Sequence, residues 1–383
     1  MIVNSICDSI HPGIRRAKKR ASRGTLPRDP GIETSIKGAM SWLKKAQDCS
    51  VSHDNGFARH YHLRKGWGSS YPETTGYIIP TLLAEARITG CNDIFDRCKK
   101  ALDWLVSIQC VNGGFPGGTA TTEGSTPTVF NTGQILLGLA EGYRIFEDNT
   151  YLNSLRNAAN WLVDIQELDG CWIQYNSPFA RKGFKTYQTH VAWGLLEAAA
   201  VTGDKSYADA AYSNIEWAIS QQNGAGWFEN CCLSDPGRPL THTIGYALRG
   251  ILEAYLHSRR NIYLETAILT GNALLNAMKP NGQIPGRLDR EWKPQVEWSC
   301  LTGMAQISIC WLMLYEYTSD KKWLEAARTT NRFLRQTQWW SEVEGINGGI
   351  SGSYPIDGEY GKYQILNWAC KFFIDAIRKE SKY

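Results

Sequence analysis

The sequence predicts an all-α fold, a closed (α/α)6 toroid of twelve helices, on the strength of a repeated phrase and of two alternating helix types. In the phrase, a large apolar residue is followed five positions later by Gln or Lys and then by a Gly-containing turn, as in Trp104, Gln109 and "NGGF". Self-similarity of this period is typical of repeat architectures. The other five units, spaced 56 to 62 residues apart, begin at Trp42, Trp161, Trp217, Leu274 and Phe333.

Each unit contains two different helical patterns. Segments such as "NDIFDRCKKALDWLVSIQ" are amphipathic, with apolar residues at helical spacing and charges on the other face. Segments such as "FNTGQILLGLAEGYRIF" are apolar nearly all round, which indicates burial on most sides. Amphipathic outer helices around apolar inner helices make a double ring, and six units suit a closed ring better than an open solenoid.

The connections between helices alternate in length. Inner helices lead to outer helices through short turns such as "TGDKS", whereas outer helices return through long segments rich in Gly, Pro and aromatic residues. Long loops in a compact domain are usually functional. We expect all six on one rim, over the N-termini of the inner helices, where helix dipoles favour anionic or hydroxyl-rich ligands.

Charge separates a short N-terminal arm from the toroid. Residues 1–34 carry seven Lys and Arg against three acidic residues, while bases and acids balance in residues 35–383, which we predict to be a single toroid domain. A neutral body argues against nucleic-acid binding. For the basic arm we expect a flexible tail, and association with an anionic membrane surface or an acidic partner is the alternative.

The sequence also bears on location and cofactors. No apolar run is long enough to span a membrane, and the basic cluster follows the apolar start in the wrong order for a secretory signal, so we predict a cytoplasmic protein. The eleven cysteines include no CxxC pair and suit reduced core thiols. His60 and His62 lack a third ligand at matching spacing, and Cys231 and Cys232 lack any, so we predict no metal and no cofactor.

Seven residues near the predicted inner-helix starts are candidate catalytic groups. Carboxylates there could serve as acids or only complement the helix dipole. His190 and His242 occupy similar places in successive repeats and could be general acids or bases, or core histidines. The full candidate set is Tyr71, Glu73, His190, His242, Glu297, Tyr354 and Asp357.

The long loops also carry aromatic, amide and basic residues suited to carbohydrate. Aromatic faces cover the apolar faces of sugar rings, and fixed polar groups bind the hydroxyls. Packing of each loop against its neighbour is the alternative for any single aromatic residue. The candidate substrate-binding residues are His60, His62, Arg64, Trp67, Asn131, Trp172, Tyr175, Arg181, Gln188, Trp227, Arg287, Trp298 and Tyr360.

Two C-terminal stretches resemble known glycan proteins. "WSCLTGMAQISICWLMLYEYTSDKKWLEAA" resembles a segment of glucuronyl C5-epimerases, and "SGSYPIDGEYGKYQILNWACKFFIDAI" resembles the end of proteins associated with exopolysaccharide synthesis. These enzymes belong to the six-hairpin superfamily, with unsaturated-uronyl hydrolases and toroidal polysaccharide lyases. The resemblance implies an enzyme acting on a uronic-acid-containing poly- or oligosaccharide, by lyase or C5-epimerase chemistry or, alternatively, as a glycoside hydrolase.

A second resemblance keeps another function open. The phrase "QxxxGGF" at Gln109 to Phe115 is similar to the repeat of terpene cyclases and prenyltransferases, but their acidic DxDD-type motif is absent. An isoprenoid enzyme is therefore an alternative, as is a non-catalytic glycan-binding protein. Within glycan chemistry, the loops hold more Tyr and His than well-placed acids, which favours proton abstraction next to a uronate carboxylate.

Overall fold

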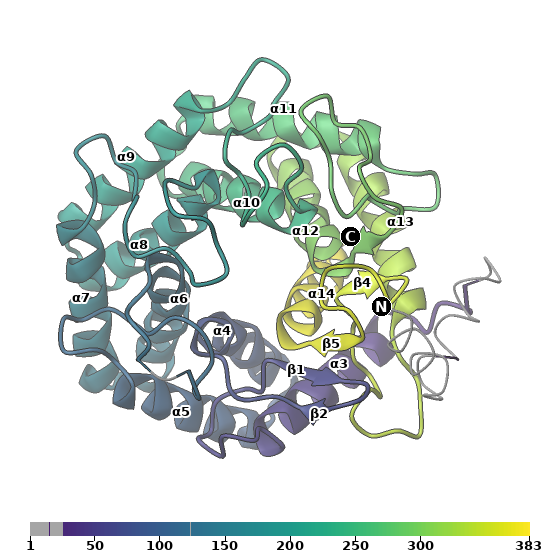
Figure 1. Cartoon of the computed structure of the whole chain (residues 1–383), viewed down its shortest axis with the longest axis horizontal. Coiled ribbons are helices and arrows are strands. Elements are labelled where there is room, and N and C mark those ends of the chain that lie inside the picture. The colour runs from purple at the N-terminus through teal and green to yellow at the C-terminus, as the bar shows by residue number, and fades with distance from the viewer. Residues whose placement is uncertain (1–14, 16–25, 123) are drawn as a thin grey trace.

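Two concentric rings of helices make up the chain, as the repeat predicts (Figure 1). The structure is a computed structural model that describes Arg15 and residues 26–122 and 124–383. Within these residues it contains twelve α-helices, α3 to α14, one short 3-10 helix and five short strands. The (α/α)6 toroid predicted from the sequence is thus confirmed.

The outer ring consists of amphipathic helices that bury one face. In α5, for example, Ile94, Cys98, Ala101, Leu102 and Leu105 are buried at helical spacing while the charged face is exposed. Asp side chains cap the N-termini of three outer helices. The outer helices are α3 (Ile32–Asp48), α5 (Asn92–Ser107), α7 (Asn149–Asp164), α9 (Lys205–Ser220), α11 (Asn261–Ala277) and α13 (Lys321–Thr337).

The inner ring closes on itself. Each inner helix packs against the next, and the last packs against the first. Glycines permit this close approach, since a Cβ at Gly138 would lie 2.3 Å from the carbonyl oxygen of Gly76 on the neighbouring helix. The inner helices are α4 (Pro72–Thr89), α6 (Val129–Phe146), α8 (Thr189–Thr202), α10 (Thr241–Ser258), α12 (Leu301–Thr318) and α14 (Asn367–Glu380).

The repeated Gln side chains join neighbouring outer helices. Gln109 Nε2 donates to the carbonyl oxygen of Gly113 in its own turn, at 2.7 Å, and to that of Ser154 in α7, at 2.9 Å. Gly113 has a φ of 93°, and a Cβ there would lie 2.3 Å from the carbonyl oxygen of Asn157, so glycine is required. The repeated phrase is therefore a structural joint. The same two-sided bond recurs at Gln47, Gln166 and Gln338.

Gln338 makes the joint that closes the outer ring, and its replacement tests the role of the phrase. Its amide donates to the carbonyl oxygens of Gly348, at 2.8 Å, and of Ser35 in α3, at 2.9 Å. Gln338→Met leaves two buried carbonyl groups without these donors, so we expect the free energy of unfolding to fall by about 2 to 3 kcal/mol in urea denaturation. Gln221→Met is the control, because among the described residues the Gln221 amide bonds to Ser220 Oγ alone. Equal losses in the two variants would contradict the joint.

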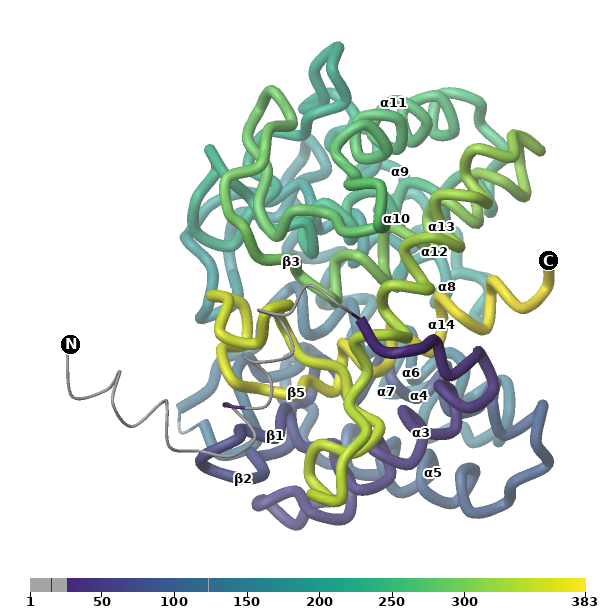
Figure 2. Tube along the Cα trace, turned by 90° about the vertical axis from the view of Figure 1, so that its right-hand side faces the viewer, coloured from purple at the N-terminus to yellow at the C-terminus, as the bar shows by residue number. Residues whose placement is uncertain are grey.

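The long loops lie on one side of the toroid, and the C-terminus lies on the other (Figure 2). Short antiparallel strands tie the first loop to the last. His60 pairs with Leu366 and His62 with Gln364, so ring closure brings these loops together. The strands are β1 (His60–His62), β2 (Gly66–Trp67) and β5 (Gln364–Leu366) in one sheet, and β3 (Ser299–Cys300) and β4 (Ser353–Tyr354) in another.

The predicted basic arm, residues 1–34, lies largely outside the described residues. Within residues 26–34, Asp29 makes a 2.8 Å ion pair with Arg335 on α13, and the carbonyl oxygen of Pro27 accepts from Gln336. Helix α3 begins at Ile32. None of the described helices is long and apolar enough to cross a membrane.

Candidate functional site

A cavity of about 590 Å³ lies where the inner helices begin, on the loop side of the ring. Most of its walls are aromatic, and its polar groups are few. The lining residues are Arg59, Tyr71, Glu73, Tyr77, Phe130, Ser177, Phe179, Tyr187, Leu233, His242, Thr243, Tyr246, Tyr360 and Trp368.

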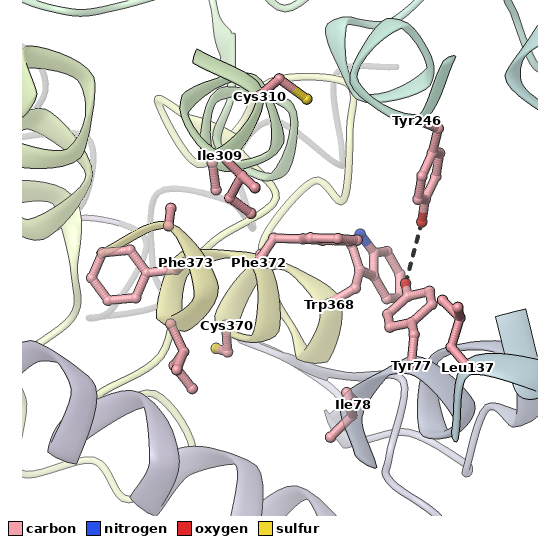
Figure 3. Close-up of a cluster of buried hydrophobic side chains, with 14 of the residues drawn as sticks. Tyr77, Ile78, Leu137, Tyr246, Ile309, Cys310, Trp368, Cys370, Phe372 and Phe373 are labelled. Atoms are coloured by element: carbon pink, nitrogen blue, oxygen red, sulfur yellow. Dashed lines mark hydrogen bonds between the residues drawn. The ribbon is translucent and has the colours of Figure 1, made fainter. Parts of the chain in front are cut away.

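Two tyrosines from opposite helices meet at the centre of the ring. Tyr77 on α4 and Tyr246 on α10 have their hydroxyl oxygens 3.4 Å apart (Figure 3). Both rings also pack on Phe372 of α14, at centroid distances of 5.4 and 5.9 Å. Around the inner ring, α4 packs between α14 and α6 and α10 packs between α8 and α12, so α4 and α10 stand three places apart and face one another (Figure 1). Side chains from these two helices therefore reach the cavity from opposite sides.

Glu73 supplies a buried carboxyl group from the first turn of α4. Its residue is 8% exposed, and Tyr71 Oη donates to Glu73 Oε2 at 2.7 Å. Burial raises the pKa of Glu73 to about 7, although the hydrogen bond from Tyr71 and the nearby positive charge of Arg59 oppose the rise. At neutral pH the carboxyl group is thus divided between its acid and its carboxylate, which suits proton transfer.

The raised pKa of Glu73 predicts how the stability of the protein depends on pH. The pKa of Glu73 rises from an ordinary 4.5 to about 7 on folding, so the folded state holds the proton more tightly than the unfolded chain. The stability that this contributes is fully present below pH 4.5 and is lost as the pH rises to about 7. Between pH 5 and 8 we therefore expect wild type to lose about 2 to 3 kcal/mol of unfolding free energy relative to Glu73→Gln, measured by urea denaturation. If the difference in unfolding free energy between wild type and Glu73→Gln is the same at pH 5 and pH 8, the raised pKa of Glu73 is contradicted.

His242, the second residue of α10, presents a neutral imidazole. Its Nδ1 lies 2.9 Å from Gln306 Oε1, and with that oxygen as acceptor Nδ1 carries the proton and Nε2 the lone pair. The ring packs against Tyr246 and Tyr360, at centroid distances of 4.5 and 5.3 Å. Burial lowers the pKa of His242 to about 4, so the ring is uncharged at neutral pH. Nε2 is the nitrogen left to accept a proton from a ligand.

Arg59 brings a positive charge to the same cavity. Its guanidinium lies over the rings of Trp368, Phe179 and Tyr71, at 5.0, 5.7 and 5.8 Å from their centroids. Its Nε is buried and has no hydrogen-bond partner among the described residues. A buried guanidinium N–H without an acceptor costs free energy, and a ligand that supplies an acceptor removes this cost. Arg59 is therefore suited to bind an anionic group in the cavity.

His190 repeats the arrangement of His242 but lies behind the cavity lining. Its Nδ1 is 2.6 Å from Gln134 Oε1, and its ring packs 4.5 Å from that of Tyr246, which lines the cavity. The residue is fully buried, and Nε2 has no partner in the described part of the chain. Burial and the charges of Arg249 and Lys371 hold its pKa well below the usual range.

The remaining catalytic candidates lie away from the cavity lining. Glu297 is exposed in the loop before β3. Tyr354 in β4 packs its ring 5.4 Å from Phe333 of α13, and Asp357 lies in the loop that follows β4. Of the seven candidates, the structure brings Tyr71, Glu73 and His242 together in the cavity.

Among the binding candidates, Tyr360 lines the cavity, where its hydroxyl accepts from Trp368 Nε1 at 2.8 Å. Four others belong to the sheet of the first loop, where Trp67 packs on Trp42 and the rings of His60 and His62 are 6.5 Å apart. No group of three or more His, Cys, Asp or Glu in residues 26–122 and 124–383 could hold a metal ion. The candidates in this sheet region are His60, His62, Arg64 and Trp67.

The other binding candidates divide by burial. Trp172 illustrates the buried group, since its residue is fully buried and its Nε1 donates to the carbonyl oxygen of Leu162 at 2.9 Å. Such residues anchor the bases of the loops. The buried candidates are Asn131, Trp172, Gln188, Trp227 and Trp298. The candidates that lie nearer the loop surface are Tyr175, Arg181 and Arg287.

Several lining residues were not among the sequence candidates. Tyr77 and Tyr246 follow Glu73 and His242 by four positions, so they occupy the same helix faces one turn deeper. That spacing is a signal from which they could have been found. For the loop residues Phe179 and Leu233 the sequence carries no comparable signal. The lining residues outside the candidate set are Arg59, Tyr77, Phe130, Ser177, Phe179, Tyr187, Leu233, Thr243, Tyr246 and Trp368.

Comparison with known proteins supports the fold. No protein-family model matches the chain, and no curated protein matches it significantly. An unsaturated glucuronyl hydrolase specific for heparin has a similar structure, with a TM-score of 0.73 over 92% of this chain and 97% of that chain at 16% identity. A cellobiose 2-epimerase from Bacillus thermoamylovorans B4167 gives 0.71 over 91% and 98% at 11% identity. A D-mannose isomerase gives 0.70 over 92% and 97% at 14% identity. The match extends over nearly the whole of each chain.

Proposed function

We propose that this protein is a carbohydrate-active enzyme that exchanges the proton next to the carboxylate of a uronic-acid residue, by C5-epimerase or lyase chemistry. The premise is the (α/α)6 toroid, a fold in which the three structures compared above are sugar-processing enzymes by their own descriptions. The observation that carries the proposal is Arg59, whose buried Nε has no acceptor among the described residues, beside the protonatable Glu73.

Sugar binding is supported by the cavity walls. Aromatic rings such as Tyr187, Tyr360 and Trp368 offer flat apolar surfaces for the faces of a pyranose ring. The guanidinium of Arg59 would bind the substrate carboxylate, since its planar donors match a carboxylate better than any other side chain. Withdrawal of electrons by that ion pair acidifies the adjacent C5 proton and stabilises the enolate formed when it leaves.

Proton transfer is supported by the positions of Glu73 and His242. His242 Nε2 takes the C5 proton, and the electron pair of the C–H bond moves into the enolate. Return of a proton from the Glu73 carboxyl to the other face of C5 gives the epimer. Because α4 and α10 face one another, the two groups reach the cavity from opposite sides, as epimerisation requires. If the electron pair instead breaks the C4–O bond, the departing oxygen takes the proton of the Glu73 carboxyl group, and the product is an unsaturated sugar.

Glycoside hydrolysis is a second candidate, favoured by the similarity to glucuronyl hydrolases. The usual two-carboxylate mechanism needs a second acid about 6.5 to 9.5 Å away when it inverts, or about 5 Å when it retains. Glu73 is the single carboxyl group among the described residues that line the cavity. This favours proton exchange over hydrolysis.

Incubation with a panel of uronate-containing oligosaccharides in D2O separates the reactions. Deuterium uptake at C5 without cleavage indicates epimerisation, and ultraviolet absorbance from a new conjugated double bond indicates elimination. Reducing ends without that absorbance indicate hydrolysis and would favour the second candidate. We expect deuterium uptake or elimination, and neither turnover nor binding across the panel would refute the proposal.

A further inference from the structure

A second cavity, of about 480 Å³, lies beside the candidate site and is strongly basic. Arg181, Lys182 and Lys185 line it, together with the side chains of Asn230 and Cys232, and none of its lining residues is acidic. No Asp or Glu among the described residues forms an ion pair with any of the three cations. Three cations at one cavity repel one another, so the cavity favours an anionic occupant.

Lys185 is the residue that makes this cavity unusual. It is only 3% exposed, although lysine is almost never buried unless it is paired. Burial lowers the pKa of Lys185, and the charge of Arg181 adds to the fall; the thiols of Cys232 and Cys231 oppose it, but no carboxylate does. A buried ammonium group without a counterion is costly, and a bound anion would remove that cost.

The same two loop segments line both cavities. Ser177, Phe179 and Tyr187 belong to the central cavity, and the residues between them, from Arg181 to Lys185, belong to the basic one. In the second segment, residues 230–233, Leu233 lines the central cavity while Asn230 and Cys232 line the basic cavity. The backbone N–H of Arg181 donates to the carbonyl oxygen of Leu233 at 2.8 Å, which joins the two segments. The two cavities therefore share this pair of segments as a common wall.

We infer that the basic cavity at Arg181, Lys182 and Lys185 binds a second acidic group, a carboxylate or a sulfate ester, on a neighbouring sugar of the same glycan. The inference rests on the proposed function and extends it, because it makes the substrate a polyanionic glycan rather than one with a single acidic residue. Arg59 binds the carboxylate of the reacting sugar, and Lys185 binds the acidic group of its neighbour.

Calorimetric titration with three oligosaccharides of equal length tests the inference. One probe carries a single uronate, the second carries uronates on two adjacent sugars, and the third carries one uronate and a sulfate ester on the adjacent sugar. Wild type is expected to bind at least one of the two dianionic probes about tenfold more tightly than the single uronate, and the probe that gains identifies the acidic group. Equal affinity for all three would overturn the inference.

Variants assign the gain to the cavity. Lys185→Met keeps the length of the buried side chain, and Arg181→Ala removes an exposed side chain. Both should abolish the preference for the dianionic probe. Lys205→Met, the same charge change on an exposed lysine of α9, should keep it. A preference that survives in both pocket variants would refute the site.

These experiments distinguish failure of the second binding site from failure of the proposed function. Turnover of the single-uronate probe without any preference for a dianion would leave the function standing and refute the second site. A preference for a dianionic probe that depends on Lys185, without turnover of any probe, would support the second site and refute the proposed enzymatic function.

Discussion

Replacing Arg59 with methionine is expected to lower kcat/KM for a uronate-containing glycan at least ~100-fold, equal to about 2.7 kcal/mol of transition-state stabilisation. The reason is that Arg59 is the one cation among the described residues lining the central cavity, and its Nε has no protein acceptor. Steady-state kinetics on the wild type and the variant measure the loss. Thermal unfolding should change little, because the side chain forms no ion pair in the described chain whose loss would strand a buried partner.

Two controls separate carboxylate binding from packing. Arg59→Lys keeps the charge but lacks the planar fork, so we expect an intermediate loss. A substrate in which the carboxylate is reduced to an alcohol should bind poorly to wild type. Its affinity should not change in Arg59→Met. If Arg59→Met lowers kcat/KM by the same factor for the neutral analogue and for the acidic glycan, Arg59 acts only through its contacts with Trp368, Phe179 and Tyr71.

Replacing His242 with glutamine is expected to lower kcat by about 10²- to 10⁴-fold, the usual contribution of a general base. Glutamine is similar in size and polar, so the affinity for substrate should change less than about threefold if His242 acts mainly in proton transfer. Single-turnover kinetics and calorimetry measure the two effects separately.

His190→Gln is the matched control for His242→Gln. Both histidines pack on Tyr246 and bond a Gln through Nδ1, but His190 does not line the cavity. We expect His190→Gln to retain kcat within about tenfold of wild type. Equal losses of kcat in the two variants would contradict the assignment of the base to His242.

The fold could be predicted from the sequence because its repeat has a physical cause. Each repeated Gln must reach both its own turn and the next outer helix, as Gln109 does with Gly113 and Ser154. The same requirement applies at Gln47, Gln166 and Gln338, so it holds in four of the six units and is visible as a period. The alternation of amphipathic and apolar helices has an equally regular cause, since each outer helix buries one face and each inner helix buries nearly all of its surface.

Site residues at helix starts were accessible to the same reasoning. The repeat places the start of each inner helix, and Tyr71, Glu73 and His242 lie there. Residues deeper in the helices, such as Tyr77 and Tyr246, follow from helical periodicity once those positions are known.

The long loops limited the prediction, because contacts distant in sequence decide where their side chains point. The direction of Arg59 depends on the adjoining strand β1, whose His60 pairs with Leu366, and no local pattern indicates that pairing. Loop aromatics had two possible roles that composition does not separate. Trp172 and Trp227 are buried at the bases of loops, whereas Tyr360 lines the cavity.

The central claim is that the enzyme breaks the C–H bond next to a uronate carboxylate. Its most direct test is the release of tritium to water from an oligosaccharide labelled at C5 of its uronic-acid residues, measured with the wild-type protein. We expect label to be released at the rate of turnover, through either epimerisation or elimination, and to be retained in His242→Gln. Turnover of the glycan with the C5 label fully retained would contradict the claim.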